Sequence, residues 1–436
     1  MRSNGYTVGL YTLGCKVSLY ETEAVAEAFS DAGFTVLPFD EVCDAYVINT
    51  CTVTAESDAK SRKYIRRALR KNPSAAVIVI GCYSQRAPDE VLAIDGVGAV
   101  IGTADKLSAV ECAKRLLLNR DERINLVSSL DGASFEPMCV RHAPRTRAYV
   151  KIEDGCECKC TYCAISAARG PVRSKRPEDV ISEVEALYAG GVREIVLTGI
   201  ETGSYGADFD EKYTLADLLC ELDARHSCER IRLGSMAPEL LSESFISRVA
   251  GLSILVPHFH VSMQSGSNSV LRAMKRRYTR ERALENIKRI RSLMGDVMIT
   301  ADLMVGFPSE SEEDFLDTMR FVSEARLLDA HVFAYSKREG TPAASYAGQI
   351  PESVKRERSA RLISEVSRVR DEVLSSVVAR GEPLMTVLEE CDGEYFTGHS
   401  DSYIEVRVRA EGHQRGELVR VHPRSHSGGV VYGEII

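Results

Sequence analysis

Hydrophobic residues in the first 127 positions form short β-branched runs, separated by segments with helical spacing. Three such runs predict buried strands: "YTVGLYTLG", "AYVINT" and "AAVIVIG". The segments between them predict helices, for example "YETEAVAEAFSDAG" and "SDAKSRKYIRRALRKN". Strands that alternate with helices are typical of a parallel sheet, so we expect an open parallel α/β domain over residues 1–127.

The alternation restarts after a Ser-, Gly- and Pro-rich stretch at 128–146, which we interpret as a linker. Strands are expected in "RAYVKIE", "REIVLTG", "RIRLGS", "HFHVSM", "VMITADLMVGF" and "DAHVFAYS". With the helical segments between them, these runs make about six βα units over 147–350. Six units are fewer than the eight of a closed parallel barrel, so the pattern predicts a partial (β/α)6 barrel.

The last part of the chain changes from helical to β-type patterning. A long charged segment over 351–379 predicts a connecting helix, and five short alternating runs follow in 380–436. Such runs predict a small antiparallel β-barrel, a fold that often holds oligonucleotides. The segment has six Arg against ten Asp plus Glu, which weakens a role in binding phosphate. A barrel that only stabilises the protein remains the alternative.

Composition narrows the class of protein. The chain has 436 residues, 44% hydrophobic and 27% charged, and no apolar run approaches the roughly 20 residues of a membrane helix. The first residues lack the features of a secretory signal, so we expect a cytoplasmic protein without membrane contact. In that compartment, 13 cysteines indicate metal binding or redox chemistry rather than disulfides.

A net charge of −8 argues against binding of nucleic acid by overall charge. Any such binding must be local. Three basic segments are candidates, although each is equally typical of a solvated helix face or loop: residues 60–71, 169–176 and 272–282.

Cysteines follow the ends of all three strands predicted in the first domain: Cys15, Cys51 and Cys82. The carboxyl ends of parallel strands lie along one edge of an open sheet, where ligands bind. We therefore expect these three thiols to lie near one another.

A second group of cysteines lies in "GCECKCTYC", after the first predicted barrel strand. A zinc ribbon needs two C-x-x-C pairs and only Cys160–Cys163 is one, while a redox pair there leaves Cys156 unexplained. The spacing C-x-x-x-C-x-x-C selects Cys156, Cys160 and Cys163 and leaves Cys158 out. Three thiolates on one tight loop can hold three irons of a [4Fe–4S] cube and leave the fourth open.

"C-x-x-x-C-x-Y-C" after the first strand of a six-unit barrel resembles the radical S-adenosylmethionine (SAM) superfamily. Further motifs resemble the methylthiotransferases of that superfamily: "LGCKVSLYETE", "VINTCTVTAESDAKSRKYIRRA", "GCYSQ", "LTGIETGSYG", "RLGSMAPE", "HFHVSMQSGSNSVLRAMKRRYT" and "DLMVGFPSESEEDF". The last barrel resembles the RNA-associated TRAM domain of this family. The resemblance covers nearly the whole chain.

The resemblance implies SAM and two [4Fe–4S] clusters as cofactors. Cys156, Cys160 and Cys163 would hold the cluster that binds SAM, and Cys15, Cys51 and Cys82 an auxiliary cluster that donates sulfur. The family also implies residues that contact the cofactors: Tyr162 beside the cluster, and Gly199, Glu201, Ser235 and Gln264 around SAM.

"NTCTVTAESDAKSRK" is most similar to the branch of the family that adds a methylthio group to carbon 2 of N6-threonylcarbamoyladenosine at tRNA position 37. The resemblance then implies a tRNA anticodon stem-loop as substrate and a low-potential electron donor of flavodoxin or ferredoxin type. Three alternatives stay open: methylthiolation of isopentenyl-adenosine, methylthiolation of a ribosomal-protein aspartate, and a non-catalytic iron–sulfur or zinc module that binds RNA.

Overall fold

The computed structural model describes residues 5–143 and 146–436, which divide into two compact units. The first unit combines 5–140 with two later segments, 149–175 and 336–344. The second contains the remaining described residues, chiefly 176–335 and 345–436. No helix in the described part of the chain is long and apolar enough to cross a membrane.

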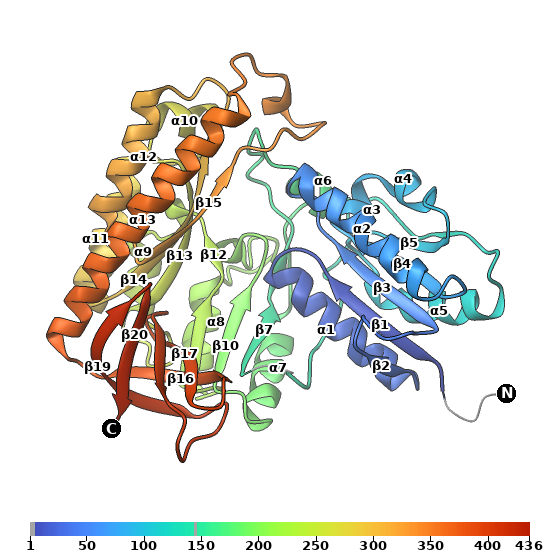
Figure 1. Cartoon of the computed structure of the whole chain (residues 1–436), viewed down its shortest axis with the longest axis horizontal. Coiled ribbons are helices and arrows are strands. Elements are labelled where there is room, and N and C mark those ends of the chain that lie inside the picture. Colours follow the sequence, from blue (N-terminus) through green and yellow to red (C-terminus); the bar gives the residue numbers. More distant parts are fainter. Residues whose placement is uncertain (1–4, 144–145) are drawn as a thin grey trace. The chain divides into compact units, whose positions relative to one another are not determined.

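A six-stranded parallel sheet forms the centre of the first unit (Figure 1). Its strand order is β2-β1-β3-β4-β5-β6. The strands are β1 (Thr7–Thr12), β2 (Thr35–Leu37), β3 (Ala45–Thr50), β4 (Ala76–Gly81), β5 (Val97–Ile101) and β6 (Ile124–Asn125). The expected open parallel α/β fold is confirmed. Three of these strands, β2, β5 and β6, add to the three that the hydrophobic runs predicted.

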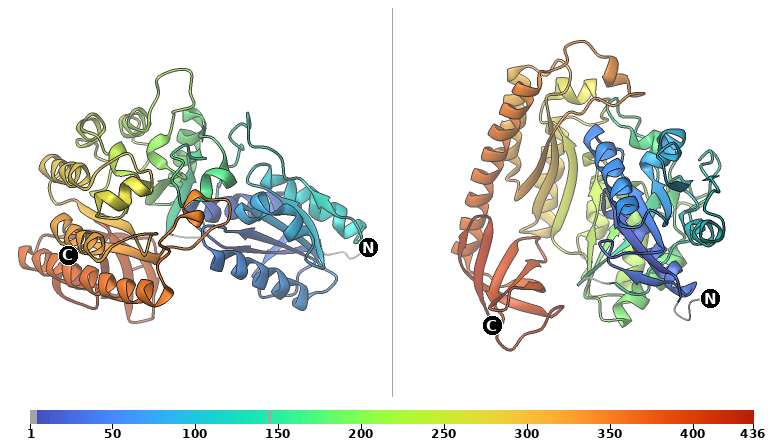
Figure 2. Two further views of the ribbon diagram at one scale, coloured as in Figure 1. Left: turned by 90° about the horizontal axis from the view of Figure 1, so that it is seen from above. Right: turned by 45° about the vertical axis from the view of Figure 1, so that its right-hand side comes forward.

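Helices cover both faces of this sheet because its strands are apolar on both sides (Figure 2). On one face lie α1 (Lys16–Asp31) and α5 (Ala109–Leu118), which pack against the sheet in one core cluster. The opposite core cluster contains residues of α2 (Ala55–Lys71), α3 (Cys82–Arg86) and α4 (Pro88–Leu92).

The first unit also contains a segment from the middle of the chain. It includes an antiparallel hairpin of β8 (Glu153–Asp154) and β9 (Arg173–Ser174). A cysteine-rich loop and the short helix α6 (Ile165–Arg169) lie between these two strands. The four cysteines of that loop therefore lie between the two strands of one small hairpin.

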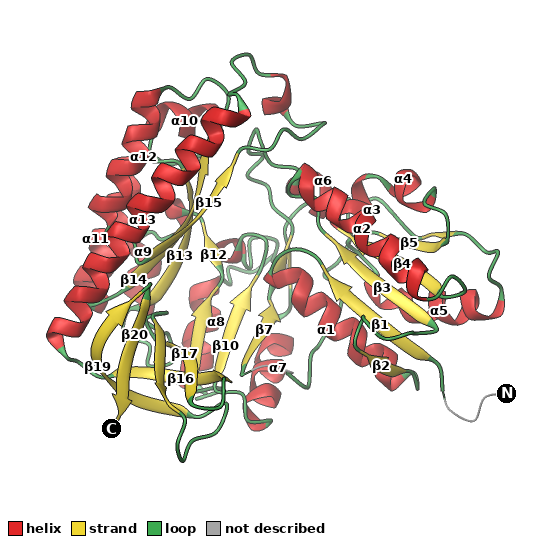
Figure 3. Ribbon diagram, viewed as in Figure 1, coloured by secondary structure: helices red, strands yellow, loops and turns green. Residues whose placement is uncertain are grey.

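The second unit contains the parallel strands of the expected partial barrel, shown in yellow in Figure 3. They form two sheets of order β11-β10-β7 and β12-β13-β14-β15. Only Gly234 separates β11 from β12, so these two count as one barrel position and the expected six are confirmed. The strands are β7 (Arg147–Lys151), which ends in the first unit, β10 (Glu194–Thr198), β11 (Arg230–Leu233), β12 (Ser235–Met236), β13 (His258–Gln264), β14 (Met298–Val305) and β15 (Asp329–Ala334).

Helices connect these strands, and local capping residues fix where several of them start. Thr214 and Ser311 each begin a helix with a capping box, in which the third helical residue is Asp217 or Asp314. The helices of this unit are α7 (Pro177–Ala189), α8 (Leu215–Ala224), α9 (Glu243–Val249), α10 (Asn268–Ala273), α11 (Arg280–Met294), α12 (Glu312–Ala325) and α13 (Glu352–Arg380).

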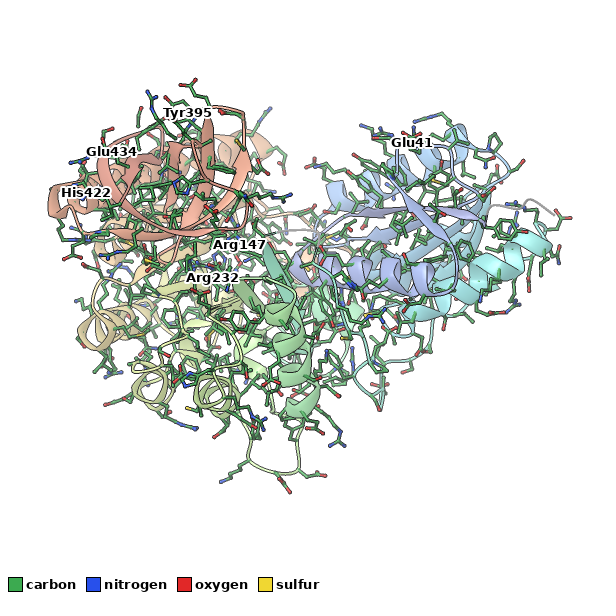
Figure 4. The ribbon with its side chains drawn as sticks, turned by 90° about the horizontal axis from the view of Figure 1, so that it is seen from below. Glu41, Arg147, Arg232, Tyr395, His422 and Glu434 are labelled. Carbon is green, nitrogen blue, oxygen red and sulfur yellow. The ribbon has the colours of Figure 1, made fainter. Side chains whose placement is uncertain are left out.

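Five strands after α13 close into a small barrel of order β16-β17-β18-β20-β19 (Figure 4). Alternate side chains fill its interior, among them the fully buried Val387, Val406 and Val431. The expected C-terminal β-barrel is confirmed. Its strands are β16 (Leu384–Cys391), β17 (Tyr395–Ser400), β18 (Glu405–Arg409), β19 (Leu418–Ser427) and β20 (Val430–Ile435).

Candidate cluster and cofactor site

Three cysteines follow three adjacent strands of the first sheet. Cys15 caps the N-terminus of α1 after β1, Cys51 directly follows β3, and Cys82 begins α3 after β4. The strands β1, β3 and β4 are neighbours, and Thr50 of β3 is in register with Gly81 of β4. The fold therefore brings these three positions to one edge of the sheet.

Two glycines allow the backbone to approach these thiols closely. Gly14 has a φ of 128°, and a Cβ there would lie 3.0 Å from Ser18 Oγ and 3.3 Å from Cys51 Cβ. Gly81 has a φ of 100°, and a Cβ there would lie 2.7 Å from the carbonyl oxygen of Thr50. Both backbone conformations favour glycine, and a Cβ would contact its neighbours tightly at Gly14 and would clash at Gly81.

Burial makes the two inner thiols weak acids. Loss of solvent, partly offset by Arg169, raises the pKa of Cys82 to about 11, and the neighbouring Cys15 and Cys51 add to the effect. Burial also raises the pKa of Cys51. Thiolates are therefore stable here only with a compensating cation. Three thiols at one sheet edge are the donor set that soft iron centres use, so these residues fit an iron–sulfur cluster.

The second cysteine group lies on the loop between β8 and α6. Gly155 precedes it with a φ of 95°, and a Cβ there would lie 1.9 Å from the carbonyl oxygen of Pro171. Cys156 N–H donates to Gly170 O at 3.0 Å, and Cys163 N–H donates to Cys160 O at 3.1 Å. The loop is thus tightly folded. Cys160 is buried, whereas Tyr162, Cys163, Cys156 and Cys158 are half-buried.

Arg169, at the end of α6, connects the loop to the first cysteine group. Its side chain is fully buried, and its Nε donates to Cys82 Sγ at 3.2 Å. The guanidinium also forms ion pairs with Glu21 of α1 and with Asp154, which precedes the loop. Arg169 therefore contacts both cysteine-bearing segments through one side chain. The alternative that Arg169 is a solvated charge in a basic surface segment is therefore wrong.

Two lysines complete a buried charge network around Arg169. Lys106 Nζ lies 3.1 Å and Lys151 Nζ 2.9 Å from Glu21 Oε1. Burial alone would raise the pKa of Asp154, but the facing Arg169 and Lys151 lower it to about 2. The same cations hold the pKa of Glu21 well below its usual value. Arg173 Nη2 also lies 3.6 Å from Asp154 Oδ2, so four cations surround two carboxylates, and Arg169 extends from this group to a thiol.

An arginine-lined pocket lies beside the residue that follows Cys51. Arg86 Nη1 and Arg338 Nη2 donate to Thr52 Oγ1 at 3.2 and 2.8 Å, and Arg338 also pairs with Asp58. The pocket has a volume of about 330 Å³. Arg338 is buried, and its Nε finds no hydrogen-bond acceptor among the described residues. This pocket offers cationic hydrogen-bond donors next to the first cysteine group.

The residues expected around SAM in the second unit lie at carboxyl ends of barrel strands, as strand position predicted. Gly199 and Glu201 follow β10, Ser235 begins β12 one residue after β11 ends, and Gln264 ends β13. Glu201 Oε1 accepts a hydrogen bond from Ala237 N–H at 3.0 Å. That bond joins the loops after β10 and β12. Ser235 lies on a strand and does not cap a helix, and Gln264 is placed on a different strand.

Buried polar atoms without partners mark this edge of the barrel. Gln264 is buried with a φ of 65°, and its Oε1 has no hydrogen-bond partner within the described ranges. The same holds for Oγ1 of Thr202. A buried acceptor that the protein leaves unsatisfied is costly, which is typical of a site that a ligand completes. These residues fit a polar cofactor such as SAM.

Sequence reasoning missed most of the buried charge network. Glu21, Lys106 and Lys151 lie at positions whose residue types are usual on surfaces, and nothing in their spacing distinguishes them. Of this network, only Arg169 could be singled out from the sequence, because it follows the cysteine loop within a basic segment. Arg338 was missed because it lies 286 positions from Thr52, which it contacts.

Two family models match the chain. Residues 150–322 match the radical SAM superfamily, and residues 7–102 match the uncharacterized protein family UPF0004. The two matches include the six cysteines whose positions are described above.

The chain is 41% identical to a threonylcarbamoyladenosine tRNA methylthiotransferase, MtaB, of Bacillus subtilis, over 95% of this chain and 93% of that protein. It is 33% identical to a tRNA-2-methylthio-N(6)-dimethylallyladenosine synthase of Saccharopolyspora erythraea, over 86% of this chain and 77% of that protein. In fold it is similar to the radical SAM methyltransferase TsrM of Kitasatospora setae, with TM-score 0.58 and 18% identity over 78% of this chain and 77% of that chain.

Proposed function

Because the chain belongs to the radical SAM tRNA methylthiotransferase family, we propose that it methylthiolates carbon 2 of N6-threonylcarbamoyladenosine at position 37 of tRNA, next to the anticodon. The observation that carries this choice is the identity to named relatives. It is 41% with a protein named for threonylcarbamoyladenosine and 33% with one named for dimethylallyladenosine.

Enzymes of this family use SAM and two [4Fe–4S] clusters, and the chain carries two cysteine triplets that suit them. We assign Cys156, Cys160 and Cys163 to the cluster that binds SAM, with Tyr162 beside it. We assign the auxiliary cluster to Cys15, Cys51 and Cys82. When bound, these groups supply a radical that removes hydrogen from carbon 2 and a methylated sulfur that replaces it.

The residues of this chain hold and orient these groups. Three thiolates for a four-iron cube leave one iron open for the amino and carboxylate groups of SAM. For the rest of the cofactor, Glu201 and Gln264 offer carbonyl or carboxylate acceptors, Ser235 offers a hydroxyl, and Gly199 contributes a position after β10 that carries no side chain. Arg169 donates a hydrogen bond toward the sulfur of Cys82 and so stabilises its thiolate form.

Two basic surfaces support tRNA as the partner. On α2, the exposed Lys63, Arg66 and Arg70 are spaced along one helix face, and no ion pair to a described residue is found for them. A groove of about 650 Å³ over α10 and α11 is lined by four arginines: Arg272, Arg276, Arg277 and Arg282. Clusters of cations attract phosphate, and the unpaired bases of an anticodon loop can be turned outward into a pocket.

We place the enzyme in the cytoplasm with a low-potential electron donor of flavodoxin or ferredoxin type. The functional segments proposed from the sequence are the cluster domain (1–127), linker (128–146), radical SAM barrel (147–350), connecting helix (351–379) and TRAM-like barrel (380–436). The substrate within tRNA is proposed to be the anticodon stem-loop.

Mass analysis of tRNA nucleosides from a strain lacking the gene tests the substrate. The methylthio-threonylcarbamoyladenosine peak should disappear and return when the gene is restored. Loss of the methylthio-isopentenyladenosine peak instead would identify the alternative nucleoside, and an unchanged set of nucleosides would direct the search to a ribosomal-protein aspartate.

Anaerobic reconstitution separates the enzyme from a module that only binds RNA. About eight irons per chain are expected from two cubes, with SAM cleavage under reductant. Cys160→Ala should lose about four irons and all cleavage. The matched control is Cys158→Ala in the same loop, which should keep the full iron content and SAM cleavage. Equal losses of iron in the two variants would contradict the ligand assignment.

A further inference from the structure

Two histidines and an aspartate share one face of the sheet β12-β13-β14-β15. His260 lies on β13, Asp302 on β14 and His331 on β15. In the sheet register His331 is opposite Asp302, and His260 is opposite Thr300, two residues before Asp302. Side chains two positions apart on a strand point to the same face, so the register itself brings the three groups together.

The ligand atoms of these residues are spaced as for a metal ion. His260 Nε2 lies 3.2 Å from Asp302 Oδ2, and His331 Nδ1 lies 3.2 Å from Asp302 Oδ1. One ligand atom from each residue lies within 4.8 Å of the other two. An ion with bonds of about 2.0–2.2 Å to nitrogen and oxygen separates adjacent ligand atoms by roughly 3 Å. The site therefore needs little rearrangement to close around a cation.

A hydroxyl behind His260 can set the tautomer that a metal requires. Thr300 Oγ1 lies 2.8 Å from His260 Nδ1 and 2.9 Å from His258 Nε2. If Nδ1 of His260 carries the proton and donates it to Thr300, the hydroxyl donates onward to His258, and Nε2 of His260 presents a lone pair toward Asp302. Such an outer partner is usual for imidazole ligands of metals.

Access and charge also suit a cation. The side chain of His331 is 78% exposed, whereas that of His260 is 9% exposed, so the site has one rigid inner ligand and one accessible ligand. Two neutral imidazoles and one carboxylate carry a charge of −1, which a divalent ion more than neutralises. Nitrogen and carboxylate donors select first-row transition metals over Mg²⁺ or Ca²⁺.

We propose that His260, Asp302 and His331 bind one divalent transition-metal ion, such as Zn²⁺, with the remaining coordination positions open on the side of His331. None of its three ligands is one of the six cysteines, and the site does not depend on which nucleoside is the substrate. It adds a mononuclear metal site to a protein whose family chemistry uses iron–sulfur clusters.

The test uses the full chain with both clusters reconstituted, so that the cluster cysteines are occupied. Weakly bound metal is first removed with a chelating resin, and the protein is then dialysed against Zn²⁺ and its zinc and iron contents are measured. One zinc per chain is expected beyond unchanged iron. X-ray absorption at the zinc edge should show nitrogen and oxygen ligands at about 2.0–2.1 Å and no sulfur near 2.3 Å.

Three variants and one control locate the ion. Asp302→Asn and His331→Gln should lose the bound zinc, and Thr300→Val should weaken zinc binding about 10–100-fold by removing the partner of His260. His331 is exposed, so its replacement should leave the fold and the iron content unchanged. The matched control is His413→Gln, which breaks a surface His–carboxylate pair with Glu417 and should bind zinc as the wild type does.

Three results would overturn the proposal: no zinc retained beyond the clusters, zinc with sulfur ligands, or equal zinc in His331→Gln and wild type. The pair of His260 with Asp302 would then be an ordinary contact in which the imidazole Nε2–H donates a hydrogen bond to the carboxylate. Every one of these measurements reports on the metal alone, so loss of activity cannot be mistaken for support.

Discussion

Each unit contains a fully buried glutamate that is surrounded by basic side chains. The two networks differ in what these basic side chains contact in addition. Glu21 in the first unit contacts Arg169, Lys106 and Lys151. In the second unit, Glu194 lies 2.7 Å from Arg232 and 2.7 Å from Arg230. Both networks are buried, so each carboxylate depends on its cations for stability.

The difference lies in what the cations contact next. From the Glu21 network, Arg169 extends to the thiol of Cys82. From the Glu194 network, Arg232 donates to the backbone carbonyls of Ser400 and Asp401, and its guanidinium lies 5.0 Å from the ring centre of Tyr403. Figure 4 labels Arg232 and Arg147 beside the C-terminal barrel. One network reaches a cysteine that we propose as a cluster ligand, and the other attaches the small barrel to the larger one.

Arg169→Met should have the largest effect, because it removes both functions of the Glu21 network. Glu21 and Asp154 lose a buried partner, which costs about 3–5 kcal/mol of unfolding free energy. Cys82 also loses its donor, so we expect the iron content to fall by up to about four of about eight atoms per chain. Urea unfolding and iron analysis measure the two effects. If the variant is destabilised but keeps its full iron content, the Glu21 network stabilises the fold only and does not differ from the second network in its role.

Arg232→Met is the matched change in the second unit. Glu194 keeps Arg230 as a partner. The expected loss of unfolding free energy is therefore at the lower end of the same range, about 3 kcal/mol. The iron content should stay at the wild-type level, and the small barrel should become more accessible to protease at its strands. If iron is lost in this variant as well, the two networks do not have separate roles.

The pH dependence of stability sharpens the comparison further. Burial alone would raise the pKa of Glu194, but Arg232 and Arg230 hold it below its usual value. A carboxyl with a lowered folded pKa stabilises the protein above the pKa of the unfolded chain, roughly 4.3, and loses this contribution as the pH falls through the folded value. The difference in thermal midpoint between wild type and Glu194→Gln should therefore be constant near neutrality and shrink only below about pH 4.3. A difference that shrinks between pH 7 and 5 would contradict this assignment.

The smallest effect is expected for Arg147→Met, at the edge of the second network. Arg147 Nε lies 3.2 Å from Glu389 Oε1, and its side chain is 16% exposed. Such a partly solvated pair contributes about 1 kcal/mol or less. The control is Arg225→Met, which removes an exposed pair with Glu221 and should change the urea midpoint less still. A loss as large as that of Arg232→Met would show that Arg147 is a central member of the network.

Much of the fold follows from sequence pattern because the deciding interactions are local. Alternation of strand and helix predicted parallel sheets in both units, and strand ends predicted where Cys15, Cys51 and Cys82 would gather. Short strands such as β2 and β6 escaped prediction, because two or three residues carry no periodic signal. They are held in place by pairing with longer neighbours.

The contacts between distant segments were beyond sequence reasoning. Arg169 and Glu21 are 148 positions apart, and nothing in either local sequence specifies the other. The same applies to His260, Asp302 and His331, which spacing places on three strands but which only the register of the sheet brings to one face. Registers depend on packing of whole strands, so one residue of slip would have separated these groups.

The first unit is assembled from three pieces of the chain, the last of which is 336–344. During synthesis, Cys15, Cys51 and Cys82 leave the ribosome long before Arg338, which pairs with Asp58 and Thr52 beside them. Contacts between such distant positions form late, because the intervening chain must be ordered first. The thiols are therefore exposed in the nascent chain while most of the protein is still being made. Delivery of iron to the auxiliary cluster proposed at these thiols must either await residue 344 or precede completion of the neighbouring pocket.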